Sequence, residues 1–287
     1  MISYKSIHNE TVRNVCENFQ FLDMGIFVHI LSSRCNMTKI ILCGCNGKMG
    51  QVISEIVKDD ADAQIVAGVD LNTEAKNGYP VFAQITECDR EADVIIDFSN
   101  PSALQEILQY GIKKQTPIVL CTTGLSEEQL EEVKRTSKQV AILRSTNMSL
   151  GINILLKLIQ EAAKILAPAG FDMEIVERHH NQKLDAPSGT ALALADSLNL
   201  ALNNEYFYKY DRSAERAKRN QKEIGISAVR GGTIVGEHEI IFAGKDEVIE
   251  LKHTAYSKAI FGNGAVQAAK FLAGKPAGAY DMADVIG

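Results

Sequence analysis

From Thr38 to about Arg144, the chain alternates short apolar runs with segments whose apolar residues recur at helical spacing. The apolar runs are KIILCG, QIVAGVD, DVIIDFS, TPIVLCTTG and VAILRS. Helical spacing occurs in KMGQVISEIVKD, PSALQEILQYGIKK and SEEQLEEVKRTSKQ, where Pro101 and Ser126 are typical of a first helical turn and of a helix start. Apolar strands that alternate with helices indicate a parallel sheet covered on both faces, so this part predicts a Rossmann-like, doubly wound α/β domain.

The pattern changes after residue 148. A long amphipathic helix is predicted over SLGINILLKLIQEAAKILA, followed by a strand, FDMEIVERHH, and a second helix, SGTALALADSLNLAL. A charged, loop-like segment, YKYDRSAERAKRNQKE, then precedes three consecutive strands, IGISAVRGG, TIVGEHEIIFAG and DEVIELKHTA. The chain ends with a helix, SKAIFGNGAVQAAKFLAGK. We therefore predict an α+β second domain with an open mixed or antiparallel sheet.

These patterns divide the chain into two domains and an extension. The first domain is expected to comprise residues 38–148, completed by residues 259–287, and the second domain residues 149–258. Residues 1–36 lack a clean amphipathic period, and they lack the basic start and long apolar middle of a signal peptide. A strand pattern follows Met37 at once, so we interpret Met37 as the start of the fold. The preceding segment is interpreted as a poorly ordered extension or a start codon assigned too early.

The composition is that of a globular protein, with 46% hydrophobic and 23% charged residues. The formal charge of −6 and the pI of about 5.6 argue against nucleic acid as a partner and leave small molecules open. The apolar runs are too short or too polar to span a membrane. The six cysteines have no disulfide-framework spacing. No second Cys/His pair lies at a zinc-like distance from Cys43 and Cys45, so we expect no metal, reduced thiols and a cytoplasmic location.

A glycine-rich segment, GCNGKMG, follows the first predicted strand and opens the first predicted helix. Gly44, Gly47 and Gly50 are spaced so that backbone N–H groups can approach a pyrophosphate at a helix N-terminus. Asn46 stands where the common fingerprint has its second glycine, and asparagine tolerates positive φ better than most residues. Asp70 ends the second predicted strand, where a carboxylate can accept hydrogen bonds from the adenosine ribose. Together these features predict a dinucleotide-binding site rather than a structural turn.

A polar run, ERHHNQKLDAPSGT, ends the long strand of the second domain and opens the helix after it. Two histidines at a strand end are more often structural than catalytic. However, neighbouring side chains on a strand point in different directions, so His179 and His180 can have separate roles. Lys183 lies close enough in sequence to share a pocket with one of them. The start of the next helix at Ser188 offers N–H groups and hydroxyls suited to a carboxylate, so the run predicts an acidic substrate and a proton-transfer step.

The chain from Met37 to Gly287 resembles the 4-hydroxy-tetrahydrodipicolinate reductase (dihydrodipicolinate reductase) family of lysine and diaminopimelate biosynthesis. HHNQKLDAPSGT is similar to the family signature H-H-x-x-K-x-D-A-P-S-G-T, and GCNGKMG, DFS, TTGLS, STNMSLGIN, AVRGGTIVGEHEI and GNGAV also match. The resemblance implies a homotetrameric enzyme, joined through the sheet of the second domain. It also implies hydride transfer from a reduced nicotinamide to C4 of a cyclic dicarboxylate, followed by a proton.

The resemblance implies roles for particular residues. His179 would donate or accept a proton and Lys183 would donate one. Residues that would hold the substrate carboxylates are His180, Ser188, Gly189 and Thr190. Residues that would bind the cofactor are Gly44, Cys45, Asn46, Gly47, Lys48, Met49, Asp70, Cys121, Thr122, Thr123, Ser145, Thr146, Asn147 and Met148.

The chain departs from the family pattern at Cys121, which replaces the glycine of G-T-T, at Asn46, and at Lys48, where arginine is common. Cys121 has no visible activating base and is interpreted as a packing residue. Asp70 favours free ribose hydroxyls, and Lys76 is the first basic residue after it. Asp70 therefore predicts a preference for NADH. The preference is expected to be modest, with NADPH also accepted, because Lys48 could reach a 2′-phosphate.

Other residues in the second domain have simpler interpretations. His238 lies in mid-strand and is expected to be structural or at a domain interface. His253 and Lys252 are expected at the surface, and Arg230 is a candidate for shaping the site from a loop. Two alternative functions stay open at this point: another nicotinamide-dependent imine or 2-oxo acid oxidoreductase, and a non-catalytic dinucleotide-sensing protein. The second alternative needs no proton relay, so the intact pair of His179 and Lys183 argues against it.

Overall fold

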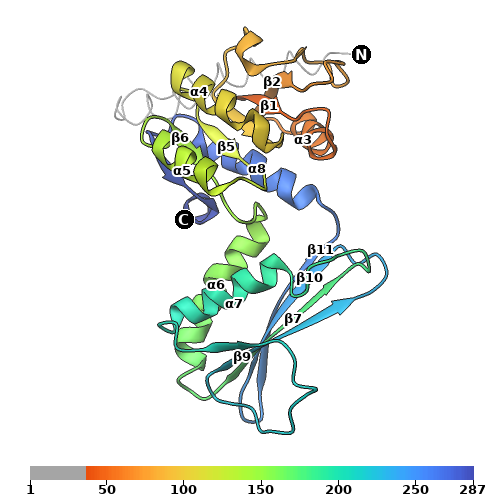
Figure 1. The fold of residues 1–287 in the computed structure, drawn as a ribbon, viewed down its shortest axis with the longest axis vertical. Coiled ribbons are helices and arrows are strands. Elements are labelled where there is room, and N and C mark those ends of the chain that lie inside the picture. Colours follow the sequence, from red (N-terminus) through yellow and green to blue (C-terminus); the bar gives the residue numbers. More distant parts are fainter. Residues whose placement is uncertain (1–36) are drawn as a thin grey trace, which may run out of the picture. The chain divides into compact units, whose positions relative to one another are not determined.

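The computed structural model describes residues 37–287 (Figure 1), and the prediction for residues 1–36 lies outside the described residues. The first sheet has seven parallel strands in the order β12-β6-β5-β4-β1-β2-β3. These strands are β1 (Thr38–Cys43), β2 (Ala63–Val69), β3 (Val81–Phe82), β4 (Val94–Asp97), β5 (Ile118–Leu120), β6 (Ala141–Leu143) and β12 (Gly278–Tyr280). The helical elements of this part are α3 (Lys48–Lys58), η1 (Ile85–Glu87), η2 (Pro101–Ala103), α4 (Leu104–Lys114), α5 (Glu127–Thr136), α8 (Ala259–Leu272) and α9 (Met282–Ile286).

The first sheet is buried on both faces, as its continuous apolar strands predict. Alternate residues of β1 point to opposite sides, so Ile40 belongs to one apolar core and Ile41 to another. On the side of Ile40, the core includes Ala265 of α8 and Ile53 of α3. On the other side it includes Leu104 of α4. The doubly wound, Rossmann-like arrangement is thereby confirmed.

Local capping residues explain where the helices begin. Ser126 caps α5, and a capping box forms because the Gln129 side chain bonds back to the Ser126 backbone. Pro101 starts the short turn η2 rather than α4 itself, because Asn100 caps that turn and α4 begins only at Leu104. The expected helix start at Pro101 is therefore three residues early.

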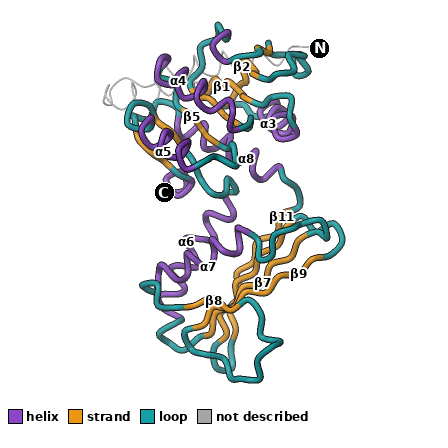
Figure 2. Tube along the Cα trace, in the orientation of Figure 1, coloured by secondary structure: helices purple, strands orange, loops and turns teal. Residues whose placement is uncertain are grey.

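The second sheet has five strands in the order β11-β10-β7-β9-β8, shown as orange tubes in Figure 2. Its strands are β7 (Asp172–His179), β8 (Phe207–Lys209), β9 (Glu223–Arg230), β10 (Gly236–Ala243) and β11 (Val248–Ala255). The central strand β7 runs parallel to β9 and antiparallel to β10, so the sheet is mixed, as predicted. The helices α6 (Leu150–Leu166) and α7 (Gly189–Ala201) contribute to the same core as this sheet.

Residues of β7 alternate strictly between buried and half-buried. Met173 and Ile175 point into the apolar core that includes α6 and α7. The same alternation places Glu177 and His179 on that buried face, at the carboxyl end of the strand. Two polar side chains thus continue the row of core residues, which makes this strand end a candidate site.

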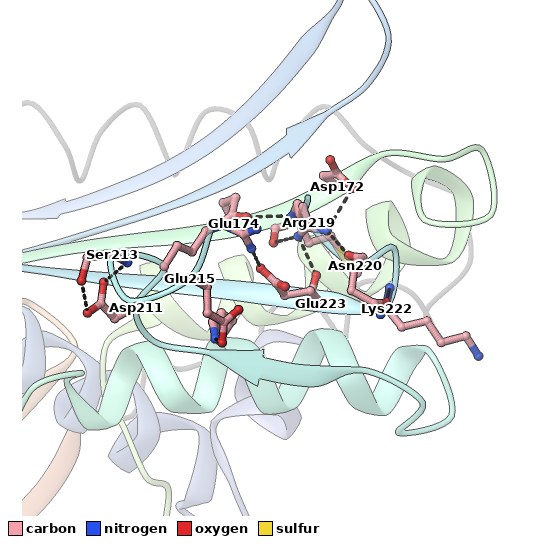
Figure 3. A network of polar contacts seen from close by, with 12 residues as sticks. Asp172, Glu174, Asp211, Ser213, Glu215, Arg219, Asn220, Lys222 and Glu223 are labelled. Carbon is pink, nitrogen blue, oxygen red and sulfur yellow. Dashed lines mark hydrogen bonds and ion pairs between the residues drawn. The ribbon is translucent and has the colours of Figure 1, made fainter. Parts of the chain in front are cut away.

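At the opposite end of β7, an arginine from the charged segment after α7 forms hydrogen bonds and ion pairs with residues of the strand (Figure 3). Arg219 bonds the carboxylates of Asp172 and Glu174 at 2.9 Å each, and it also donates to the backbone oxygens of Met173 and Glu223. The segment is therefore held against the sheet by charged contacts. The loop-like prediction missed strand β8, which begins at Phe207.

Candidate active site

The glycine-rich turn after β1 is packed too tightly for side chains at two of its positions. Gly44 has a φ of +76°, and a Cβ there would lie 2.6 Å from the Phe98 oxygen. A Cβ on Gly50 would lie 2.2 Å from the oxygen of Gly44. These contacts require glycine, and they bring the turn close to the start of α3.

Asn46 does not have the role that its position suggested. It is absent from the positive-φ residues, so the argument from backbone tolerance is wrong. Its side-chain amide instead donates to the backbone oxygens of Asn72 and Glu74 at 2.6 and 3.0 Å, and its N–H donates to Asp70 at 3.0 Å. Asn46 therefore holds the loop that follows β2 against the glycine-rich turn, which a glycine could not do.

The start of α3 fits an anionic ligand. Gly47 is the N-cap and supplies no side-chain hydrogen bond, whereas Ser126 and Ser149 cap their own helices. First-turn N–H groups at a helix start favour negative charge. A cavity of about 390 Å³ is lined by the turn and the adjoining strand ends, including Gly44, Gly47 and Asp70. The uncapped helix, the glycine cradle and the terminal carboxylate together fit a dinucleotide.

A buried carboxylate organises the next strand end. Asp97 ends β4 and accepts hydrogen bonds from the hydroxyls of Ser99 and Thr122, at 2.5 and 2.7 Å. The hydroxyl hydrogen of Thr122 therefore points at Asp97. Burial, and secondly the charge of Asp97, hold the pKa of Cys121 well above its usual range. The thiol stays protonated and packs against the core beside α8, which confirms its interpretation as a packing residue.

The segment between the two sheets connects the predicted cofactor and substrate residues. The Asn147 side-chain amide donates to the Thr190 hydroxyl at 3.1 Å, and its side-chain oxygen accepts from the N–H of Ser149 at 2.9 Å. Ser145 and Thr146 line a different hollow, formed with α6, α7 and the C-terminal residues. Their role near the nicotinamide stays a prediction.

At the end of β7, a fully buried carboxylate contacts residues of its own strand, of β9 and at the start of α7. Glu177 is 0% exposed. Its oxygens accept from both terminal nitrogens of Arg230, at 2.7 and 2.8 Å, and from the Ser188 N–H at 3.0 Å. One oxygen also lies 2.5 Å from Nδ1 of His179. Burial opposes ionisation, but the hydrogen bonds from Arg230, His179 and Ser188 outweigh it and hold the pKa of Glu177 below its usual range.

Two further histidines lie beside His179. His238 is 5% exposed, its Nε2 is 3.0 Å from the Ser188 hydroxyl, and its ring meets the His179 ring edge-on at 5.1 Å. Burial, with the charge of His179, lowers the pKa of His238 to about 4, so it is neutral at pH 7. Its structural role agrees with the prediction. His253 is half-buried and lines a cavity of about 80 Å³ with His179 and His238, so its prediction as a surface residue is wrong.

Lys183 and the start of α7 complete the site. Lys183 pairs with Asp185 at 2.8 Å, and its charge reaches His238, whose pKa it lowers slightly. Ser188 caps α7 through the Ala191 N–H, and Thr190 follows in the first turn. His180 is half-buried and directly follows the last residue of β7. The structure thus brings His179 and the α7 N-terminus together, with Lys183 within electrostatic range of the same cluster.

Sequence reasoning assigned no role to Glu177 and placed Arg230 in a loop. Arg230 is the last residue of β9, and β9 pairs with β7 so that Arg230 stands opposite His179. The period-two pattern of β7 carried the information, because it put a glutamate and a histidine on the face that faces the core. Among residues 37–287, no group of three or more His, Cys, Asp or Glu could hold a metal ion.

No helix in this range is long and apolar enough to cross a membrane.

The doubly wound sheet, its glycine-rich turn and the proton-bearing cluster at the end of β7 define a nicotinamide-dinucleotide-dependent oxidoreductase. The family model "Dihydrodipicolinate reductase, N-terminus" matches residues 38–148, and "Dihydrodipicolinate reductase, C-terminus" matches residues 151–286. The chain belongs to the dihydrodipicolinate reductase family.

Similar proteins agree with this assignment. The chain is 51% identical over 250 residues to the 4-hydroxy-tetrahydrodipicolinate reductase of Caldanaerobacter subterraneus subsp. tengcongensis, covering 87% of this chain and 98% of that protein. It is 48% identical over 250 residues to the enzyme of the same name from Clostridium novyi, with the same coverage. A dipicolinate-bound dihydrodipicolinate reductase from Paenisporosarcina sp. TG-14 has the same fold, with a TM-score of 0.74 at 24% identity, covering 88% of this chain and 100% of that one.

Proposed function

We propose that this chain catalyses the NAD(P)H-dependent reduction of 4-hydroxy-tetrahydrodipicolinate, by way of dihydrodipicolinate, to tetrahydrodipicolinate. The observation that carries the proposal is the buried cluster of Glu177, His179 and Arg230 at the start of the ERHHNQKLDAPSGT segment. Such a cluster provides an oriented imidazole beside a helix start that favours a carboxylate. The relatives that share about half of the chain's residues are named for this reaction.

In the proposed reaction, 4-hydroxy-tetrahydrodipicolinate loses its 4-hydroxyl as water to give dihydrodipicolinate, and the reduced nicotinamide supplies a hydride to C4 of that ring when the cofactor is bound. His179 and Lys183 carry the proton that completes the two-electron reduction. His180, Gly189 and Thr190 hold the substrate carboxylates, through N–H groups and the Thr190 hydroxyl at the start of α7 and the imidazole of His180. Ser188 supports this role by capping α7, since its N–H bonds Glu177 and its hydroxyl accepts from the Ala191 N–H. Support for these roles is the turn that joins Lys183 to the strand end, where the Lys183 N–H donates to the His180 backbone oxygen at 3.2 Å, and the capping of α7 by Ser188.

The cofactor would be held by the first sheet and its loops. The predicted binding residues are Gly44 to Met49 and Asp70, with Cys121 to Thr123 and Ser145 to Met148 toward the nicotinamide. Because Asp70 would face a 2′-phosphate with like charge, we propose a preference for NADH on the order of 2–20-fold in kcat/KM, or about 0.4–1.8 kcal/mol. Residues 38–148 with 259–287 would form the dinucleotide-binding domain, and residues 149–258 the substrate-binding and oligomerisation domain.

We also propose that the enzyme is a homotetramer joined through the second sheet. The face of this sheet opposite its core carries Val229, Val248 and Ile241. Val229 is 43% exposed and Val248 is 56% exposed. Light scattering of the purified full chain tests the assembly, since a monomer would contradict it.

A coupled assay tests the proposed function. The substrate is formed enzymatically from pyruvate and aspartate semialdehyde, and the loss of NADH or NADPH absorbance is followed. Oxidation that depends on both substrate precursors supports the proposal. No oxidation with either cofactor would favour a dinucleotide-sensing protein, whereas oxidation only with other imines or 2-oxo acids would favour a different oxidoreductase.

A further inference from the structure

The carboxylate of Glu177 is the centre of the hydrogen-bonded cluster at the end of β7. It is 0% exposed, yet four donor atoms from three residues, His179, Ser188 and Arg230, converge on its two oxygens. The oxygen that Ser188 does not use lies 2.5 Å from Nδ1 of His179. Because Glu177 accepts from Arg230 and is ionised, the Nδ1 atom must carry a hydrogen to form this contact.

The other ring nitrogen of His179, Nε2, is available for proton transfer. No described residue hydrogen-bonds Nε2. This atom lies beside Gly236, where an added Cβ would be 3.1 Å from it, and the His179 ring lines the small cavity shared with Thr190 and His238. A carboxylate on one imidazole nitrogen fixes the tautomer and the ring orientation, so that the opposite nitrogen can take or give a proton.

Charged and titratable groups approach this imidazole from every element around it. Glu177 lies on the same strand and Arg230 on β9, while His238 lies on β10 and His253 on β11. Two lysines, Lys183 in the loop after β7 and Lys258 at the cavity wall, and Asp185 beside Lys183 complete the set. Glu177 is the one carboxylate in this set within hydrogen-bonding distance of the His179 ring. The remaining groups are neutral or positive, apart from Asp185, which is paired with Lys183.

We propose that Glu177 is a positioning residue for the reaction: it holds His179 in the Nδ1–H tautomer with Nε2 directed at the substrate, and it stabilises the imidazolium form. Arg230 has the supporting role of keeping Glu177 ionised through two hydrogen bonds. This inference rests on the proposed function, because it needs His179 as the proton-transferring group. Glu177 does not contact the reacting atoms and is not itself a catalytic residue.

The first test is Glu177→Gln, which keeps the shape of the side chain. Its amide would donate to Nδ1 and force the Nε2–H tautomer. We expect kcat to fall by about 10²–10⁴-fold with little change in the KM for the cofactor.

A second variant separates positioning from folding. Glu177→Gln leaves the Arg230 charge buried without its carboxylate and could destabilise the chain. Glu177→Gln combined with Arg230→Met removes both charges, so its stability should recover while its kcat stays low. Recovery of kcat to within about threefold of wild type in the double variant would overturn the proposal, because the carboxylate would then be dispensable.

Glu174→Gln is the matched control. Glu174 lies on the same strand and pairs with an arginine, Arg219, at 2.9 Å, but it points to the other face of the sheet and contacts no histidine (Figure 3). We expect it to keep kcat within about twofold and an unchanged pH profile of kcat/KM. A loss in this control as large as in Glu177→Gln would show that any lost arginine pair on β7 is sufficient, and would overturn the proposal.

The spectroscopic readout does not depend on turnover. In ¹⁵N-histidine-labelled full chain, the ring signals of His179 are assigned by difference from His179→Gln. The proposal requires Nδ1–H in wild type and a change of tautomer in Glu177→Gln, with none in Glu174→Gln. An unchanged His179 ring in Glu177→Gln would refute the positioning role. An inactive wild-type enzyme with the expected ring signals would instead refute the proposed function and leave the positioning of His179 standing.

Discussion

Replacing Arg230 by methionine should expose how much the buried pair with Glu177 contributes to stability. Glu177 is 0% exposed and the Arg230 side chain is 19% exposed, so the pair is largely shielded from water. Breaking a buried ion pair by removing one partner costs about 3–5 kcal/mol, because the other charge is left without compensation. For a chain of this size, each kcal/mol corresponds to a fall of roughly 2–4 °C in Tm. We expect Arg230→Met to unfold about 6–20 °C below wild type near pH 8.

The pH dependence of this deficit is the sharper test. In wild type the pKa of Glu177 is lowered, so the pair stabilises the fold above the carboxyl's unfolded pKa of about 4.3 and this contribution is lost as pH falls through the folded pKa. Without Arg230, the pKa of Glu177 rises, because the largest of the hydrogen-bond contributions that offset burial is removed. The variant's penalty is therefore largest at high pH and is relieved as Glu177 takes up a proton.

The assay is thermal unfolding of both proteins at pH 5 and pH 8, followed by circular dichroism. Lys164→Met is the control, since Lys164 pairs with Glu161 at 2.7 Å on α6, where the lysine side chain is 50% exposed. Partly exposed pairs of this kind contribute about 0–1 kcal/mol. A deficit for Arg230→Met that is equal at the two pH values, or no larger than that of the control, would refute the reasoning.

Three further predictions concern catalysis and binding. Lys183→Ala should lower kcat by about 10²–10⁴-fold while the fold survives, and an unchanged kcat/KM would assign Lys183 to the surface. His180→Gln should raise the KM for the dicarboxylate more than it lowers kcat, and steady-state kinetics showing only a kcat loss would remove His180 from the binding role. Asp70→Ser should reduce the preference for NADH over NADPH, because it removes the like charge beside a 2′-phosphate. The measurement is the ratio of kcat/KM for the two cofactors at one ionic strength. An unchanged ratio would exclude Asp70 as the discriminating group.

Much of the fold could be predicted because its strands carry strong periodic patterns. The apolar runs of β1, β4 and β5 are buried on both faces, and the period of two in β7 is preserved from Met173 to His179. Short elements were missed, since β3, β8 and β12 have two or three residues each and too few positions to show a period. Helix α9, with five residues, depends on the capping box of Asp281 rather than on an apolar stripe.

The site was predicted less completely than the fold because its important contacts join distant parts of the chain. The Nδ1 contact between His179 and Glu177 spans two residues and could be inferred from the strand period. The pair between Glu177 and Arg230 spans 53 residues and depends on the register of β9 beside β7. Asn46 likewise donates hydrogen bonds to residues 26 and 28 positions away. The tolerance of asparagine for positive φ therefore gave no information about these contacts.

Transfer of a labelled hydride tests the central claim most directly. The purified full chain is incubated with NADH that carries deuterium at both C4 positions of the nicotinamide and with substrate formed from pyruvate and aspartate semialdehyde. The product is analysed by mass spectrometry and NMR. We predict tetrahydrodipicolinate that carries one deuterium, bonded to the carbon derived from substrate C4, at a rate equal to cofactor oxidation. Cofactor oxidation without deuterium in the product, or no reduced product, would contradict the account.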